Sequence, residues 1–128
     1  MICVYEYVLT FKQENSVDGG TDIYALRSTY YQGSLMVNLC DIELVGKRLN
    51  HNGVAINITK EYWQERLVRS EEAEDLLKKC SIANLAGKSI VDKAIRIRLA
   101  NPNSVKQFSG IPFLMLFRFT QTYNTNNK

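Results

Sequence analysis

Apolar and polar residues alternate at the start of the chain, which is the pattern of a half-buried β-strand. From Cys3 to Lys12, every second residue is apolar or aromatic, so one face of a strand would be covered. Glu14 to Asp22 follows as a loop, because it is rich in residues that interrupt regular structure. We predict a strand that either lies at an edge of the sheet or binds a partner protein.

Strand patterns continue in two predicted β-hairpins. Their strands are Ile23 to Tyr31, Leu35 to Cys40, Lys47 to Asn50 and Val54 to Ile58. Gln32-Gly33-Ser34 turns the first hairpin, and His51-Asn52-Gly53 turns the second, since Asn-Gly fits a type I′ turn. A short turn, Lys60 to Trp63, follows. We predict that Tyr62 and Trp63 fold over the sheet, although they could instead stack on an RNA base.

The pattern changes to a 3.6-residue period after residue 69, which predicts two amphipathic helices. Ser70 is the expected N-cap of the first, Glu71 to Cys80, whose acidic start and basic end match the helix dipole. Asn84 is the expected N-cap of the second, Leu85 to Leu99. The segment Ser81 to Lys88 would therefore be a junction between two helices.

Gly87 falls in the first turn of the second predicted helix. A glycine there favours close packing against a neighbour, or an anion at the helix N-terminus, where free N–H groups point outward. No Gly-x-Gly-x-x-Gly motif accompanies it. We interpret Asn84 and Gly87 first as a cap and a packing residue, and only second as ligand contacts.

The last part of the chain predicts two more strands. Asn101-Pro102-Asn103 ends the second helix, because proline cannot continue it. Val105 to Phe108 is a short strand, and Phe113 to Phe119 is the last one. This last strand is almost entirely apolar, so we expect it in the centre of the sheet, covered on both faces. Gln121 to Lys128 is a polar tail.

Together these elements predict an α+β fold, a twisted and mainly antiparallel sheet or half-barrel of hairpins packed against two consecutive helices. A chain of 128 residues suits a single domain, residues 1–128. Within it, residues 1–22 would be an added strand and loop, residues 23–119 the core, and residues 120–128 the tail.

Composition narrows the class of protein. The chain has no apolar run of membrane-spanning length and no evident signal peptide, so we expect a cytoplasmic protein with no membrane partner. Three cysteines, an odd number, and a single histidine make a structural zinc site improbable. We therefore expect neither a metal nor a cofactor.

Charge is mildly basic overall but unevenly distributed. The net charge is +3, and the segment from Lys78 to Lys106 holds seven basic residues but only one acid, Asp92. This excess is either a solvated helix face or a surface that binds phosphates. The candidate RNA-binding residues are Lys47, Arg48, Lys78, Lys79, Lys88, Lys93 and Arg96.

Two carboxylates lie two residues apart, Asp41 and Glu43, before a flexible Gly46. Such a pair could act as general acid and base. A capped turn that leaves the sheet is the interpretation we favour, because no nucleophile stands nearby. We do not expect an enzyme.

Three short motifs carry a family resemblance. They are Cys40-Asp41-x-Glu43-Leu44-x-Gly46-Lys47, Ile82-Ala83-Asn84-Leu85-x-Gly87 and Gly110-Ile111-Pro112. In order and spacing, the chain resembles the archaeal domain-of-unknown-function family 424 from about Ile23 to Phe119. The resemblance implies a cytoplasmic archaeal protein linked to translation genes, with no established activity. Residues 1–22 lie outside it, and Phe113-Leu114-Met115 stands where members often carry a polar residue.

Three functions compete on these observations. The first is a small basic accessory protein of the archaeal translation apparatus that contacts rRNA on the ribosome. The second is an enzyme or small-molecule binder, in which Asp41 and Glu43 meet Asn84 and Gly87 in one pocket, with Lys47 orienting the ligand. The third is a protein–protein adaptor that adds residues 1–12 as a strand to a partner's sheet.

Overall fold

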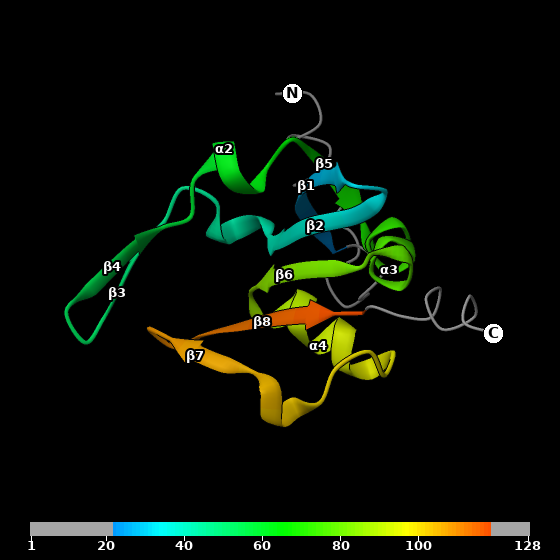
Figure 1. Cartoon of the computed structure of the whole chain (residues 1–128). Helices are drawn as coiled ribbons and strands as arrows, with labels where there is room; N and C mark the ends of the chain where they lie inside the picture. The colour runs from blue at the N-terminus through cyan, green and yellow to red at the C-terminus, as the bar shows by residue number, and fades with distance from the viewer. Residues whose placement is uncertain (1–21, 119–128) are drawn as a thin grey trace.

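A six-stranded sheet forms the framework of the molecule, and the computed structural model describes residues 22–118 of it (Figure 1). The strands are β1 (Ile23–Tyr31), β2 (Ser34–Asp41), β5 (Arg66–Arg69), β6 (Ile82–Ala86), β7 (Lys106–Phe108) and β8 (Ile111–Phe117). Their spatial order is β5-β1-β2-β6-β8-β7, and a separate hairpin pairs β3 (Arg48–His51) with β4 (Val54–Asn57). Among these described strands, only β2 and β6 pair in parallel. The α+β fold predicted from the sequence is confirmed.

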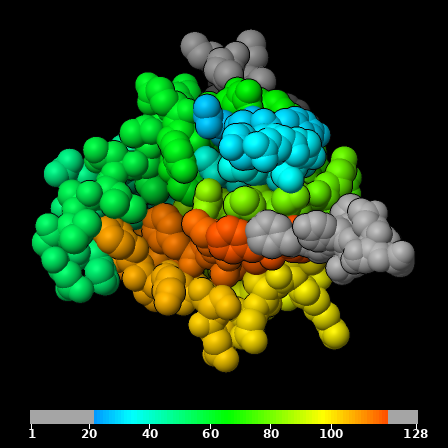
Figure 2. All heavy atoms as spheres, viewed as in Figure 1, coloured from blue at the N-terminus to red at the C-terminus, as the bar shows by residue number. Residues whose placement is uncertain are grey.

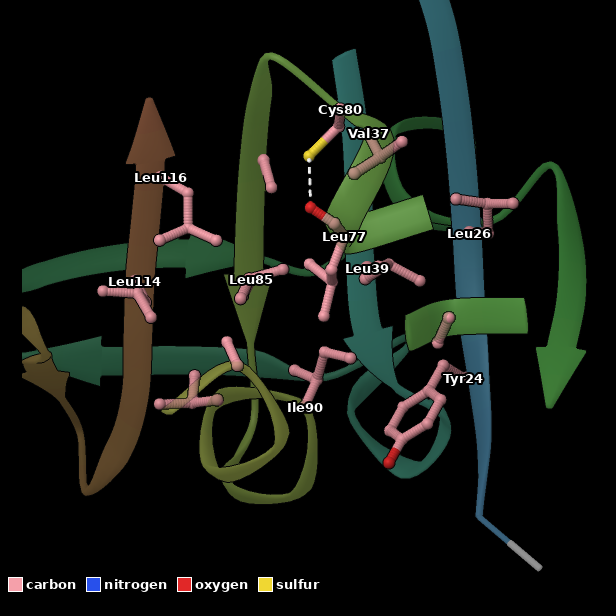
Figure 3. Packing of buried hydrophobic residues seen from close by; sticks show 14 of the residues in the cluster. Tyr24, Leu26, Val37, Leu39, Leu77, Cys80, Leu85, Ile90, Leu114 and Leu116 are labelled. Atoms are coloured by element: carbon pink, nitrogen blue, oxygen red, sulfur yellow. Dashed lines mark hydrogen bonds between the residues drawn. The ribbon is translucent and has the colours of Figure 1, made fainter. Parts of the chain in front are cut away.

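Two helices, α3 (Ser70–Lys79) and α4 (Lys88–Arg96), pack on one face of the sheet. Leu77 of α3 and Ile90 of α4 are fully buried against the sheet residues Leu39 and Leu85 (Figure 3). α3 contacts the β5 side of the sheet, while α4 contacts β2, β6 and β8. Apolar side chains on one face of the strands therefore form one side of this core, and the apolar faces of the two helices form the other.

The opposite face is covered only in part by described residues. The 3₁₀ turn η2 (Ile42–Leu44), the hairpin and the short helix α2 (Lys60–Trp63) form a second, smaller core over Cys40 and Ala86. Trp63 is buried there, as predicted, but Tyr62 is 52% exposed, so the prediction that both aromatic residues fold over the sheet is wrong for Tyr62. Figure 2 looks onto this face, with β8 (orange) crossing its middle.

The largest error of the sequence prediction concerns the segment Ser81 to Lys88. It contains the strand β6, hydrogen-bonded between β2 and β8, in place of a helix junction. Asn84 lies in the middle of this strand and caps no helix. Ile82-Ala83-Asn84-Leu85-Ala86 is apolar at both faces except at Asn84, and a buried strand and a buried helix cannot be distinguished by such a short run.

Smaller corrections concern the ends and edges of elements. Strand β5 was not predicted, and it pairs with β1 at the edge of the sheet. Ser70 is the first residue of α3 and does not cap it, because Arg69 occupies the N-cap position. Strand β8 is not covered on both faces, since Met115 is 54% exposed. The predicted strand Cys3 to Lys12 and the polar tail Gln121 to Lys128 lie outside the described residues.

Candidate functional site

The start of helix α4 is built from residues that are far apart in the sequence. Strand β6 ends at Ala86, and Gly87 follows with φ 118° and ψ 151°, a conformation essentially restricted to glycine. Asp41, at the end of the neighbouring parallel strand β2, accepts hydrogen bonds from the backbone N–H groups of Ser89 and Ile90, both at 2.9 Å. A carboxylate from another strand therefore caps this helix.

Gly87 is required here by space as well as by conformation. A methyl group built on Gly87 would lie 2.5 Å from Asp41 Oδ2 and 2.7 Å from Asp41 Cβ. The N–H of Gly87 also donates to the carbonyl oxygen of Pro112 in β8, at 2.9 Å. Asp41, Gly87 and Pro112 come from the three motifs of the family resemblance, so these motifs converge on the first turn of α4.

Further polar groups surround the Asp41 carboxylate. Ser89 Oγ donates to Asp22 Oδ2 at 3.0 Å and lies 2.7 Å from the hydroxyl of Tyr24. Asp41 is only 4% exposed, and burial raises the pKa of its carboxyl to about 6 although the two backbone hydrogen bonds lower it. Burial also raises the pKa of the Tyr24 hydroxyl. Asp22, Tyr24 and Ser89 were not singled out in the sequence.

An open cleft of about 650 Å³ lies above this network and is called the α4 cleft. Its lining includes Asp22, Asp41, Glu43, Lys88, Asp92 and Arg96. The cleft stands at the carboxyl ends of two adjacent parallel strands, a common location of ligand sites in α/β sheets. Its charges are mixed, and Asp41 already occupies the N–H groups that an external anion would need at this helix start.

Gly87-Lys88-Ser89 resembles the end of a phosphate-binding loop, a match that sequence reasoning missed. The full motif Gly-x-x-x-x-Gly-Lys-Ser requires a glycine five positions earlier, where this chain has Ile82. Ile82 belongs to strand β6, so no loop precedes the helix to surround a phosphate. The structure therefore gives the Gly-Lys-Ser sequence a packing role and no nucleotide site.

A second concavity lies on the face of the sheet opposite α3 and α4, which the described residues cover only in part, and is called the open-face pocket. It measures about 280 Å³, and its lining includes Tyr62, Trp63, Asn84, Lys106, Phe113 and Met115. Asn84 Nδ2 donates to Asn38 Oδ1 at 3.0 Å, and Asn38 Nδ2 donates to the carbonyl oxygen of Tyr62 at 3.0 Å. This chain of amides fixes the Asn84 side chain at the pocket.

The structure separates the residues that the enzyme hypothesis joined. Asp41 and Glu43 line the α4 cleft, while Asn84 lines the open-face pocket on the other side of the sheet. Gly46 lies at the base of the hairpin and donates its N–H to the carbonyl oxygen of Ile58 at 2.7 Å. Gly110, with φ 79°, turns β7 into β8. The single pocket of Asp41, Glu43 and Asn84 is not formed.

The seven predicted RNA-binding residues lie in three places. Lys88, Lys93 and Arg96 are on α4, Lys78 and Lys79 end α3, and Lys47 and Arg48 are at the hairpin. Lys93 is buried, with its Nζ 3.9 Å from a carboxylate oxygen of Glu74. Lys106 of β7 is exposed but was missed as a candidate, although it stands in the basic segment.

Metal and membrane features are absent from the part of the chain that the structure describes. No group of three His, Cys, Asp or Glu side chains among residues 22–118 could hold a metal ion. No helix in the same range is long and apolar enough to cross a lipid bilayer.

Residues 29–119 match the family described as "Protein of unknown function (DUF424)". The chain belongs to the DUF424 family. Its fold is similar to the crystal structure of an uncharacterized conserved protein from Methanopyrus kandleri, with a TM-score of 0.63 and 15% sequence identity. That similarity covers 77% of this chain and 96% of the other, and it shows a shared fold. No curated protein matches the chain. The family resemblance seen in the three motifs is thus confirmed.

Proposed function

We propose that this DUF424 protein is an RNA-associated accessory protein of the archaeal translation apparatus that contacts rRNA on the ribosome. The observation that carries the proposal is the separation of charge between the two edges of the sheet. Strand β5 forms one edge and strand β7 the other. Acidic residues gather on α2, β5 and α3, whereas exposed basic residues lie on α4, on the segment after it and on β7. Lys88, at the start of α4, lies beside the carboxylates of the α4 cleft.

The acidic side lies around α2, β5 and the first turns of α3. Residues 61–75 hold six acids, and only Arg66 and Arg69 are basic. Arg66 is already paired, with its Nη2 2.6 Å from a carboxylate oxygen of Glu72. This side of the molecule would repel a polyanion.

The basic side lies around α4, β7 and the segment between them. Residues 88–118 hold six basic residues and one acid, Asp92. Four of the basic side chains are exposed and are called the basic edge: Lys88, Arg96, Arg98 and Lys106. Only Lys88 among them has an ion pair in the described structure, an exposed one with Asp92 at 3.4 Å. Such an exposed pair is worth about 1 kcal/mol or less, so a phosphate could replace the carboxylate.

Phosphate contacts of this kind position a protein on RNA without reading its sequence. The salt dependence of binding tests for these contacts, since each phosphate contact releases counterions. Four contacts to single-stranded RNA would give a slope of about −3 in log affinity against log salt concentration.

The first experiment is sedimentation of a native lysate at low and high salt, probing ribosomal fractions for the protein. We expect it to travel with ribosomal particles at low salt and to leave them at high salt. A protein that stays in the ribosome-free fraction at low salt contradicts the proposal.

Two matched variants locate the contact surface. Arg96→Gln with Lys106→Gln removes two positive charges from the basic edge, and Lys60→Gln with Arg66→Gln removes two from the acidic side. We expect the first pair to weaken binding to purified archaeal ribosomes and to lower the salt slope by about 1.4. The second pair should leave both unchanged. Equal effects of the two pairs would mean that net charge alone, and no defined surface, controls binding.

A further inference from the structure

We propose that the open-face pocket binds one unpaired nucleobase that carries an exocyclic amino group, as adenine and cytosine do. This inference rests on the proposed function, because it takes single-stranded RNA as the ligand, and it adds which part of that RNA is bound. The walls, the floor and the rim of the pocket each favour this occupant.

The walls of the pocket are suited to a flat ring. Tyr62 is 52% exposed, and its ring is held at a 73° angle to the buried ring of Trp63, with 5.6 Å between the centroids. Met115 on β8 is 54% exposed and lines the same pocket. Exposed aromatic side chains are surfaces on which unpaired RNA bases stack, and Tyr62 presents one from α2 at the side of this pocket.

The floor of the pocket holds a polar group whose orientation can be assigned. The carbonyl oxygen of Tyr62 can only accept, so Asn38 must present its NH₂ group there. The oxygen of Asn38 then faces Asn84, which must donate its own NH₂ group. The Asn84 Oδ1 atom is left without a hydrogen-bond donor among residues 22–118.

An amide fixed in this way selects among ligands. A free carbonyl oxygen accepts a hydrogen bond from an exocyclic amino group, while the second N–H of Asn84 donates to a neighbouring ring nitrogen. This is the pairing by which asparagine recognises adenine. Uracil has no amino group, so it would place a carbonyl oxygen against Asn84 Oδ1 and bind less well.

The rim of the pocket supplies complementary charge. Lys106 lines the pocket and is exposed on β7, at the basic edge of the molecule. A phosphate beside the bound base could reach this ammonium group. The pocket therefore adjoins the basic edge at Lys106, while Tyr62 and Trp63 on its other wall belong to α2, on the acidic side.

The test uses fluorescein-labelled oligoadenylate, oligouridylate and an RNA duplex, with binding to the full chain measured by fluorescence anisotropy. We expect oligoadenylate to bind more tightly than oligouridylate or the duplex. Tyr62→Ala should weaken oligoadenylate binding at least about fivefold, the loss typical of one stacked base. The matched control is Tyr30→Ala, which removes a tyrosine that is 72% exposed and does not line the pocket; it should have no effect.

The amide is tested separately. Asn84→Ala should abolish the preference for adenine over uracil, and in the native chain adenosine monophosphate should shift the side-chain amide NMR signals of Asn84 more than uridine monophosphate does. The NMR measurement needs no variant, so it remains decisive if Asn84→Ala weakens the fold.

The outcomes separate this inference from the proposed function. If Tyr62→Ala and Tyr30→Ala bind oligoadenylate equally well, or if adenosine monophosphate leaves the Asn84 amide signals unmoved, the nucleobase pocket is wrong while ribosome association can still stand. If the protein is absent from ribosomal fractions but oligoadenylate binds through Tyr62, the proposed function fails and the pocket remains.

Discussion

Replacing Gly87 with alanine is the sharpest test of how the three motifs hold the start of α4 together. The added methyl group would meet Asp41 at 2.5 Å from Oδ2, a distance that real Cβ atoms do not show. Asp41 cannot simply move away, because its carboxylate holds the backbone N–H groups of Ser89 and Ile90. The substitution therefore strains the backbone and displaces the cap together.

The expected magnitude follows from these two effects. Holding a residue other than glycine at the Gly87 backbone angles costs about 1–3 kcal/mol. Losing one of the two hydrogen bonds to the charged Asp41 carboxylate costs about 1.5–3 kcal/mol more. Gly87→Ala should thus lower the free energy of unfolding by about 2.5–6 kcal/mol, a large part of the stability of a small domain.

Urea denaturation measures this loss, and Gly53→Ala is the matched control. Gly53 also has a positive φ, 83°, but a methyl group there would meet no atom within 4 Å. We expect it to cost about 1–2 kcal/mol, from backbone strain alone. In an Asp41→Ala background, Gly87→Ala should cost only its strain, so the two substitutions should be non-additive. Equal costs at Gly87 and Gly53, or full additivity with Asp41→Ala, would refute the reasoning.

Three further predictions concern protons, packing and thiols. The pKa of Asp41 is raised from 3.8 to about 6 in the folded protein, so its contribution to stability is complete only well below pH 3.8 and is lost as the pH rises through 6. Urea denaturation at pH 4 and pH 7 should show a fall of about 2 kcal/mol that Asp41→Asn removes. Leu77→Ala should cost about 2–5 kcal/mol in the same assay, whereas Val54→Ala, at a residue that is 55% exposed, should cost about 0.5 kcal/mol or less. In a Cys3→Ser variant, which keeps only Cys40 and Cys80, a thiol reagent should react at the rate of unfolding, because both side chains are buried and burial raises the pKa of Cys40 to about 12. Rapid reaction of the folded chain would contradict this.

The local elements of this fold could be predicted because their patterns are local. The strand-forming run Ile23 to Tyr31 and the Asn52-Gly53 turn each specify structure within a few residues, and both the strand and the turn formed as expected. Helix α3 was likewise recognised from its period and its charged ends. The α+β class followed from the sum of these elements.

The centre of the sheet could not be predicted in the same way. A run of five residues such as Ile82 to Ala86 suits a buried strand or a buried helix, and its state is decided by β2 and β8 on either side. Because that run was interpreted as the approach to a helix, Asn84 was predicted to be an N-cap. In the structure it is a strand residue that lines the open-face pocket. The cap of α4 was equally hidden, because Asp41 lies 48 residues before Ser89 in the chain.

The sequence allowed the motif residues of the site to be recognised, but not the residues that they contact. Asp41, Gly87 and Pro112 were singled out from three separate motifs, and only the tertiary structure shows that they meet. Lys93 stood in the basic segment with the same appearance as Arg96, yet helix geometry buries one and exposes the other. Burial of a single lysine depends on the packing of α3 against α4, which sequence spacing does not specify.

The capping of α4 from another strand has a consequence for how the chain folds. Gly87 offers the helix no side-chain cap of its own, so a nine-residue segment would have little helical stability in isolation. The helix gains its N-terminal partner only when β2 and β6 have already aligned in parallel, which requires closing a loop of about forty residues. Helix formation and sheet closure should therefore occur as one cooperative step, with α4 protected from hydrogen exchange no earlier than the central strands.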